Sequence, residues 1–474
     1  MILLGGKMRI LKYLNIIIFS LTVLFSFNLY SEEKTIRIVS KDLSADNELH
    51  QQYMSIGVEA LKKQGIDIKL EIVELTGGQS YKEKLPLAIM SGDIPDIIYD
   101  QYGYDKVMSD QGILEDLTPY VANSEHLQNA MWKHNKERLK NYPYLIRAHP
   151  PRIRIGTVRA EWLEMAGMDE PQNLDDYYKM LKAFSESDFD GNGANDSFGL
   201  TMTGSTKRCD WIFEPAFGLG ATWDKNSDGY SHRYINPKQK DKFAFYNKLY
   251  EEGILDPEFI TDKWDVMEDK YYSGKAGMIC GSIGLTMNVY QGKMDNVQGK
   301  HTPILALKPP ANAFAPIDAS KEGRGYMISA LSDVKEEAFA FLEYWASAEG
   351  LITEKLGLPG VHHNVNDGKY ELTEKHPTHE PLFWEPNIPA PVDIFVPAAT
   401  QSFNYAAELV TYDNKFAFPE ELQAQADSAE NTYWEYSYKF ITGEIPLSDF
   451  DAYVDTWLSS GGKDITEYAN TVLK

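Results

Sequence analysis

The sequence predicts an α/β fold built on parallel sheets. Apolar strand patterns at 35–39, 67–73 and 97–99 alternate with helical patterns that end near Lys63 and Met90. Such alternation is typical of βα units that share one parallel sheet. The run Ile97–Tyr99 is continuous and apolar, as expected of a strand that is buried on both faces. Helical patterning resumes over 124–140.

A proline-rich segment at 142–159 breaks this alternation. Pro143, Pro150 and Pro151 precede the extended run Ile153–Val158, which suits a crossover between two lobes. Beyond it, Asn173 caps a helix that carries apolar residues at helical spacing. Further strands are expected at 198–202, 275–280, 304–307 and 325–330, with helices at 240–253, 264–273 and 334–347 and a mostly helical tail from 419.

The charge balance argues against polyanionic partners. The chain has 70 acidic and 46 basic residues, a formal charge of −24. Such a field does not attract nucleic acid or an anionic membrane, so we expect neither as a partner. The two cysteines, Cys209 and Cys280, are too few for a disulfide framework, and the sequence leaves open whether they form one bridge.

The first residues have the pattern of an export signal. Lys7, Arg9 and Lys12 form a basic region, and an apolar run follows from about Leu14 to Phe27. Ser31 is a small residue at a suitable cleavage position, so we expect a signal peptide over 1–31 and a periplasmic protein. An uncleaved N-terminal anchor is the alternative.

Polar residues at the end of the strand 97–99 are the first candidates for a binding site. Asp100, Gln101 and Tyr102 follow this strand at its carboxyl end. In open α/β sheets, ligands bind outside the carboxyl ends of the strands. We therefore expect the strand to deliver this loop to a cleft.

Several segments together resemble the extracellular solute-binding proteins of ABC transporters, in the family that includes the maltose-binding protein. The order and spacing of these segments carry the resemblance, which extends over the mature chain; they are Gly92–Asp96, Gly112–Leu114, Leu249–Leu255, Tyr272–Ala276, Glu349–Gly350, Gly357–His363 and Phe440–Trp457. The large oligosaccharide binders, among them the alginate-binding proteins, look most similar.

The resemblance implies a two-lobe type II periplasmic binding protein fold with a ligand cleft between the lobes, which closes by a hinge motion. Lobe 1 is expected to hold 32–150 and 318–356, and lobe 2 to hold 151–317 and 357–474. The implied partners are an oligosaccharide and the permease and ATPase subunits of an ABC importer, and a monomer is expected.

Sugar recognition needs aromatic faces and planar polar groups, so the resemblance places the ligand site in loops at strand ends and crossovers. The expected ligand-binding residues are Lys41, Asp42, Asp100, Gln101, Tyr102, Arg152, Arg154, Trp211, Ser282 and Trp384. Arg152 and Arg154 could equally form a surface or interlobe salt bridge, and Trp211 could equally be a core residue. The segment of Ser282 lacks the aromatic residue that the maltose-binding protein has there. Lys41, Arg147, Arg152, Arg154, Lys207 and Arg208 hint at an acidic sugar.

The loop 188–196 has the spacing of a calcium-binding loop. Side-chain oxygens stand at positions 1, 3, 5 and 9, and the carbonyl of Ala194 at position 7; the expected ligands are Asp188, Asp190, Asn192, Ala194 and Asp196. Gly193 occupies position 6, where such a loop turns sharply. Position 12 is Gly199 and not the bidentate glutamate of an EF-hand, and an Asx-rich turn without metal is the alternative. We expect one structural Ca²⁺.

The sequence therefore predicts a non-catalytic periplasmic receptor that binds an oligosaccharide for an ABC importer. No His-Glu-x-x-His zinc motif, Gly-x-Ser-x-Gly elbow or Walker loop occurs in the chain, and the pair His362-His363 lacks spaced carboxylates for a metal. Two alternatives remain: a secreted, calcium-dependent glycan-degrading enzyme and a peptide-binding receptor of the same fold.

Overall fold

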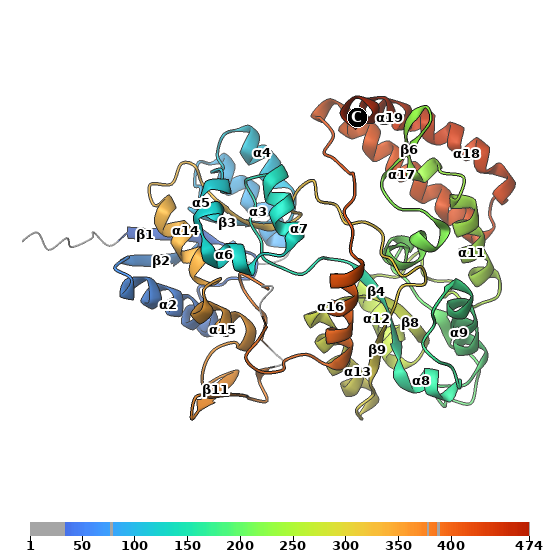
Figure 1. Cartoon of the computed structure of the whole chain (residues 1–474), viewed down its shortest axis with the longest axis horizontal. Helices are drawn as coiled ribbons and strands as arrows, with labels where there is room; N and C mark the ends of the chain where they lie inside the picture. The colour runs from blue at the N-terminus through green and yellow to red at the C-terminus, as the bar shows by residue number, and fades with distance from the viewer. Residues whose placement is uncertain (1–33, 76–78, 377–378, 386–388, 474) are drawn as a thin grey trace, which may run out of the picture.

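A computed structural model describes residues 34–75, 79–376, 379–385 and 389–473, with the side chains of Gln79 and Ser80 not described (Figure 1). The chain forms two α/β lobes that lie side by side, as Figure 1 shows. The predicted leader 1–31 lies outside the described residues. Within the described residues, no helix combines the length and the apolar character needed to cross a membrane.

The first lobe is built on a four-stranded sheet with the order β10-β3-β1-β2. Its strands are β1 (Lys34–Val39), β2 (Ile68–Ile72), β3 (Ile97–Asp100) and β10 (Gly325–Ile328). The first three run parallel, and β10 is antiparallel to β3. Ile36 and Ile38 of β1 join one apolar core, whereas Val39 joins another, so both faces of the sheet are covered.

Helices cover this sheet on both sides. The helices of this lobe are α2 (Glu48–Lys63), α3 (Gln79–Met90), α4 (Tyr104–Asp110), α5 (Thr118–Asn123), α6 (Glu125–Ala130), α7 (Lys133–Asn141), α14 (Lys335–Tyr344) and α15 (Ala348–Leu356). The helix expected over 124–140 is thus two helices, α6 and α7. The chain breaks at Met131 and Trp132, where both residues have extended backbone conformation.

The second lobe has a four-stranded sheet with the order β5-β8-β4-β9. The strands are β4 (Arg154–Arg159), β5 (Phe198–Leu200), β8 (Ala276–Ser282) and β9 (Ile304–Leu307). The central strand β4 is antiparallel to both neighbours. Its helices include α8 (Ala160–Met165), α9 (Leu174–Glu186), α10 (Asp210–Phe213), α12 (Trp264–Ser273), α13 (Leu285–Gln298) and α16 (Pro397–Leu409).

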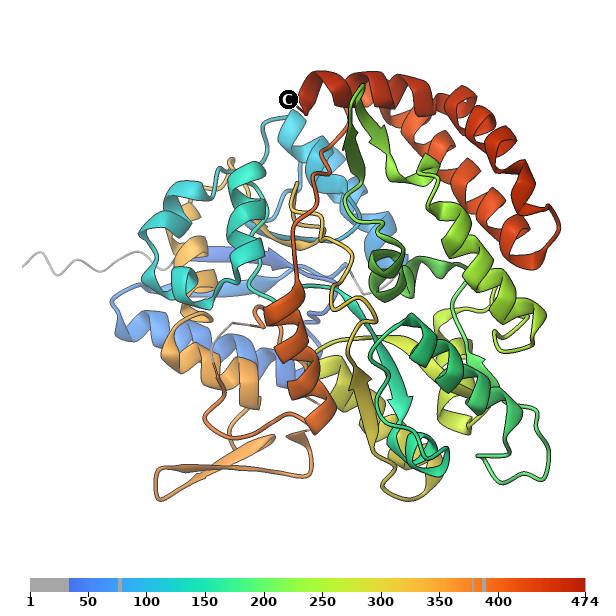
Figure 2. The same cartoon turned by 45° about the vertical axis from the view of Figure 1, so that its right-hand side comes forward.

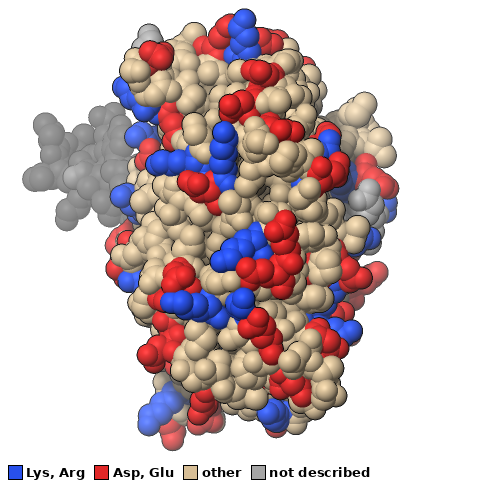
Figure 3. Space-filling view, turned by 90° about the vertical axis from the view of Figure 1, so that its right-hand side faces the viewer, with Lys and Arg blue, Asp and Glu red and all other residues tan. Residues whose placement is uncertain are grey.

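The C-terminal segment folds back onto the second lobe. Helices α17 (Glu420–Thr442), α18 (Phe450–Trp457) and α19 (Lys463–Val472) lie beside α11 (Gln239–Glu251) and the hairpin of β6 (Trp223–Asn226) and β7 (Gly229–His232), as Figure 2 shows. Their apolar side chains belong to the same core as the second sheet. On the outer face of this lobe, acidic and basic side chains lie interspersed (Figure 3).

One expected lobe boundary is wrong. The second part of the expected lobe 2 is 357–474, but Leu358, Phe383 and Trp384 are buried in the core of the first sheet. The hairpin of β11 (His363–Asn366) and β12 (Lys369–Leu372) lies in this segment, on the side of α15 (Figure 1). The apolar side chains Phe383 and Trp384 find their partners on β10 and α14, which hold the segment on the first lobe.

Candidate functional site

A cavity of about 670 Å³ lies between the two lobes. The first lobe contributes Lys41 and Asp42 after β1, Tyr99 in β3 and Tyr326 in β10. The second lobe contributes one face of α13 and the segment Asp393–Val396. The cavity therefore lies at the carboxyl end of β1 and beside Tyr99 near the end of β3, where α/β sheets bind ligands.

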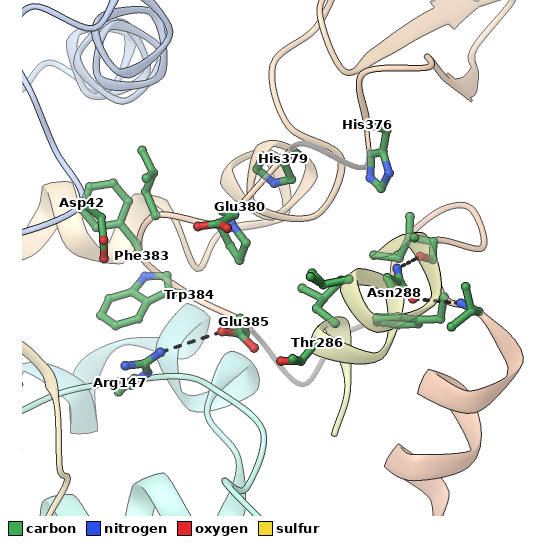
Figure 4. Close-up of a pocket in the computed structure, with 18 of the residues that line it drawn as sticks. Asp42, Arg147, Thr286, Asn288, His376, His379, Glu380, Phe383, Trp384 and Glu385 are labelled. Atoms are coloured by element: carbon green, nitrogen blue, oxygen red, sulfur yellow. Dashed lines mark hydrogen bonds and ion pairs between the residues drawn. The ribbon is translucent and has the colours of Figure 1, made fainter. Parts of the chain in front are cut away.

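Two arginines from distant parts of the chain lie together on the first wall. The backbone of Ile146 pairs with that of Tyr326, which brings Arg147 beside Arg324. Arg147 lies 3.8 Å from a carboxylate oxygen of Glu385, as the dashed line in Figure 4 marks, and its Nη1 donates a 3.4 Å hydrogen bond to the hydroxyl of Tyr99. Burial and the charge of Arg147 lower the pKa of Arg324.

The opposite wall starts at a tight turn into α13. Gly284 has φ +73°, and a Cβ there would lie 2.6 Å from the ring of Phe403, so only glycine fits. Asn288 then fixes the neighbouring segment, since its side chain donates to the Ile394 carbonyl at 2.5 Å and accepts from the Val396 N–H at 3.0 Å. Thr286 faces Glu385 of the first lobe in Figure 4.

Three of the residues expected to bind ligand line this cavity. Lys41 and Asp42 form an ion pair at its edge. Trp384 also lines it, but the side chain is only 1% exposed and its indole N–H donates to the Leu342 carbonyl at 2.9 Å. The ring is thus a core residue behind the wall and not an exposed platform for a sugar.

The loop after β3 is placed differently from expectation. Asp100 is buried, and its carboxylate accepts hydrogen bonds from the N–H groups of Tyr102 at 2.8 Å and Asp105 at 3.0 Å. The carboxylate therefore closes the turn into α4, and burial raises its pKa. Gln101 and Tyr102 are half-buried and, like Asp100, are not among the residues that line the cavity.

The remaining expected residues belong to the second lobe. Arg154 donates to the hydroxyl of Ser282 at the end of the second sheet, and Arg152 is exposed. Trp211 lines a separate small cavity of about 100 Å³ together with Trp434. The structure thus divides the expected site residues among the interlobe cavity, the loop after β3 and the second lobe.

The residues that sequence reasoning missed come mainly from α13, from Asp393–Val396 and from Arg324. Arg147 is one of the cations that hint at an acidic sugar in the sequence, but it is not one of the expected ligand-binding residues. No local pattern marks Arg324, because its neighbour Arg147 becomes adjacent only through the pairing of Ile146 with Tyr326.

Asn192 is the centre of the hydrogen bonds within the loop 188–196. Asp188 accepts hydrogen bonds from the N–H groups of Asn192 and Gly193, both at 2.9 Å. The side-chain nitrogen of Asn192 lies between Asp190 and Asp196, at 3.0 and 2.9 Å from their oxygens. Over the part of the chain that the structure describes, no three His, Cys, Asp or Glu side chains are grouped so that they could hold a metal ion.

Cys209 and Cys280 are both buried free thiols.

Comparisons with known proteins agree with this architecture. LipO of Bacillus subtilis (strain 168), a lipoprotein, is 27% identical over 484 residues, covering 92% of this chain and 91% of LipO. The polygalacturonan/rhamnogalacturonan-binding protein YtcQ of the same organism is 26% identical over 422 residues, covering 81% of this chain and 82% of YtcQ.

Solved structures share the two-lobe fold. The alginate-binding protein AlgQ2, solved without calcium ion, superimposes with a TM-score of 0.61 at 18% identity, covering 92% of this chain and 97% of that one. An EF-hand mutant of the Streptococcus pneumoniae substrate-binding protein FusA, in complex with fructo-nystose, gives a TM-score of 0.61 at 17% identity, with coverages of 93% and 98%. The α/β fold of two lobes expected from the sequence is therefore confirmed.

The sequence profile of one family extends over most of the chain. It matches residues 47–352, which include every strand of the two four-stranded sheets except β1, and Arg147 and Arg324 of the first wall. The chain belongs to the bacterial extracellular solute-binding protein family.

Proposed function

We propose that the protein binds an oligosaccharide in the cavity between its lobes and delivers it to the permease subunits of an ABC importer. The observation that carries this proposal is the cavity itself, whose walls come from the strand ends of one lobe and from α13 of the other. A ligand that contacts both walls favours a closed arrangement of the lobes, which gives the receptor two states that a permease can distinguish.

The chemistry of the walls suits a sugar. The half-buried Phe395 offers an apolar face, while Arg147, Arg324 and Thr286 offer planar or hydroxyl hydrogen-bonding groups. YtcQ and AlgQ2 are named as binding proteins for polygalacturonan or rhamnogalacturonan and for alginate, which supports the same class of ligand. None of these names describes an enzyme, and we infer a receptor without catalytic activity.

Calorimetric titration against a panel of oligosaccharides and peptides tests the proposal. We expect saturable binding, with one site per chain, for at least one oligosaccharide and no binding of peptides. Tight binding of a peptide in the absence of any sugar binding would contradict the proposal. Release of new reducing ends from a polysaccharide would instead favour the glycan-degrading alternative.

The loop 188–196 would hold a structural Ca²⁺ through oxygens of Asp188, Asp190, Asn192 and Asp196 and the carbonyl of Ala194. These side chains already converge on Asn192. Rotation of the Asn192 amide by about 180° would present its oxygen where its nitrogen now lies, so the donor set fits a hard cation. AlgQ2 was solved without calcium ion and FusA as an EF-hand mutant, which supports this proposal.

The protein is further proposed to be an exported monomer, with cleavage near Ser31. The family and the lipoprotein LipO support export. The first lobe would comprise 32–150 and 318–385, with the third crossover between Glu385 and α16.

A further inference from the structure

Two guanidinium groups meet at one end of the second sheet. Arg154 is the first residue of β4 and pairs in register with Ser282, the last residue of β8. Arg208 ends a short 3₁₀ turn, and its Nε donates a 3.1 Å hydrogen bond to the carbonyl of Cys280. Both arginines therefore reach the final residues of the same strand.

This arginine pair is not neutralised within the described part of the chain. Neither arginine has a carboxylate within ion-pair distance there, and Nη2 of Arg208 is buried without a hydrogen-bond partner. The nearby acid Glu268 already binds Lys293 at 2.7 Å and Tyr272 at 3.1 Å. Burial and the charge of Arg208 lower the pKa of Arg154 to about 10, as expected when two like charges share a partly dry environment.

The other buried cations of the protein show what is normal for this chain. The buried Arg138 and Lys242 and the half-buried Lys270 each lie within 3.3 Å of a carboxylate oxygen, and the buried Arg159 lies 3.7 Å from one. Acids exceed bases by a wide margin, with a formal charge of −24, so carboxylates are not scarce. A half-buried pair of arginines without a carboxylate is costly unless another anion binds there.

Neither arginine is among the residues that line the interlobe cavity, but the strand end that both reach leads directly to it. Ser282 is followed at once by Ile283 and Gly284, and the next residues, Leu285 and Thr286, line the cavity. The first turn of α13 carries no acidic residue, so its N–H groups add to the local preference for an anion. The ring of Trp264, 37% exposed, stacks 4.0 Å from the guanidinium of Arg208 and orients it.

We propose that Arg154 and Arg208 bind a carboxylate of the ligand, so that the oligosaccharide of this receptor contains uronic acid residues. This inference rests on the proposed function and names the substrate class of the same site. Guanidinium groups match carboxylates in shape and can bind them through two parallel hydrogen bonds.

The first wall of the cavity carries an arginine pair of its own. Arg147 and Arg324 form a second pair there, with Glu385 3.8 Å from Arg147 as the near acid, and Nε of Arg324 has no hydrogen-bond partner among the described residues. An oligosaccharide that carries several carboxylates would thus find an arginine pair on each lobe.

Calorimetry with trigalacturonate and with its fully methyl-esterified form tests the inference on the full mature chain. We expect trigalacturonate to bind at least about tenfold more tightly than the ester, and Arg154→Gln or Arg208→Gln to weaken trigalacturonate about tenfold to a hundredfold. Neither substitution should change the affinity for the uncharged ester by as much. Lys263→Gln removes an exposed cation beside Trp264 and should leave both affinities unchanged. Thermal unfolding of each variant verifies that it is folded.

The outcomes separate the inference from the proposed function. Equal affinity for the acid and the ester, or affinities that are indifferent to both arginine substitutions, would overturn the uronate inference and leave oligosaccharide binding intact. If no oligosaccharide binds, the proposed function fails. A titration with glucuronate alone then tests whether the arginine pair is an anion site. Binding of this monocarboxylate that Arg208→Gln abolishes would support the anion site, and its failure to bind would overturn it.

Discussion

Trp132 and Phe403 stack on each other across the two lobes, with ring centroids 6.1 Å apart and ring planes inclined by 22°. Trp132 precedes α7 of the first lobe, and its indole N–H donates to the Glu385 carbonyl at 3.1 Å. Phe403 lies on α16 of the second lobe, where it also packs against Phe395. An apolar cavity of about 210 Å³ beside the pair is lined by residues of both lobes.

This stacking predicts a measurable energetic coupling between the lobes. In a double-mutant cycle with Trp132→Ala and Phe403→Ala, we expect an interaction free energy of about 0.5–1.5 kcal/mol from urea unfolding. A cycle of Trp132→Ala with Met165→Ala, an exposed residue of α8, should be additive within about 0.5 kcal/mol. Additivity of the Trp132 and Phe403 substitutions would show that the contact does not hold the lobes together.

A buried ion pair joins α7 to the segment just before β10, and its removal should be costly. Glu322 accepts from Nη1 of Arg138 at 3.1 Å and from Nε2 of His149 at 3.1 Å. Burial disfavours the charged carboxylate, but His149 and Arg138 outweigh it and hold the pKa of Glu322 below its usual range. Glu322→Gln leaves Arg138 buried without its counterion and should lower the free energy of unfolding by about 3–5 kcal/mol.

The matched control for this pair is Glu137→Gln. Glu137 lies 3.7 Å from Lys140 on the surface of α7, with its side chain 42% exposed. Because water screens such a pair, the change should be within about 0.5 kcal/mol. Similar losses for the two variants in denaturant unfolding would contradict the role given to Glu322.

A buried acid on α15 predicts an unusual pH dependence of stability. Burial raises the pKa of Glu354 to about 8, against hydrogen bonds such as the one from the Phe383 N–H at 3.1 Å. The folded state thus keeps a proton that the unfolded state loses near pH 4.5. The stability that this proton provides is fully present below about pH 4.5 and is lost as the pH rises through about 8.

Glu354→Gln replaces the carboxyl by a neutral group of the same shape and should remove this dependence. Relative to the original chain, the variant should gain stability between pH 5 and pH 8, by at least about 1 kcal/mol at pH 8. Melting temperatures at the two pH values measure the difference. A difference that stays constant with pH would show that Glu354 does not titrate in this range.

Chelation should lower the melting temperature if the loop 188–196 holds Ca²⁺. At a calcium concentration a hundredfold above the dissociation constant, the ion stabilises the fold by about 2.7 kcal/mol. Asp190→Ala should abolish the response to EDTA and to added calcium, whereas Asp228→Ala, in the turn of the β6–β7 hairpin, should retain it. If neither EDTA nor added calcium changes the melting temperature of the original chain, the proposed calcium site is contradicted.

The sheets could be predicted from the sequence because their signals are local. The continuous apolar run Ile97–Tyr99 is buried throughout, and the strand pattern at 275–280 includes the first five residues of β8. The split of the expected helix at Met131 could not be predicted, because both halves keep helical patterning.

The binding site was only partly predictable, because exposure depends on contacts between distant segments. Trp384 looks like a loop aromatic in the sequence but packs against Tyr326 and Leu342. Arg147 and Arg324 become neighbours only when Ile146 pairs with Tyr326. Lys41 and Asp42, just after β1, could be found from their place at a strand end, but the same reasoning failed for Asp100, whose carboxylate closes the turn into α4.

Small-angle X-ray scattering tests the central claim, that a ligand binds between the lobes and draws them together. The measurement compares the mature protein alone with the protein saturated by the oligosaccharide that calorimetry selects. Because the cavity of about 670 Å³ has walls from both lobes, we expect the radius of gyration to decrease on binding. An unchanged radius of gyration at full saturation would contradict binding by closure of the interlobe cavity.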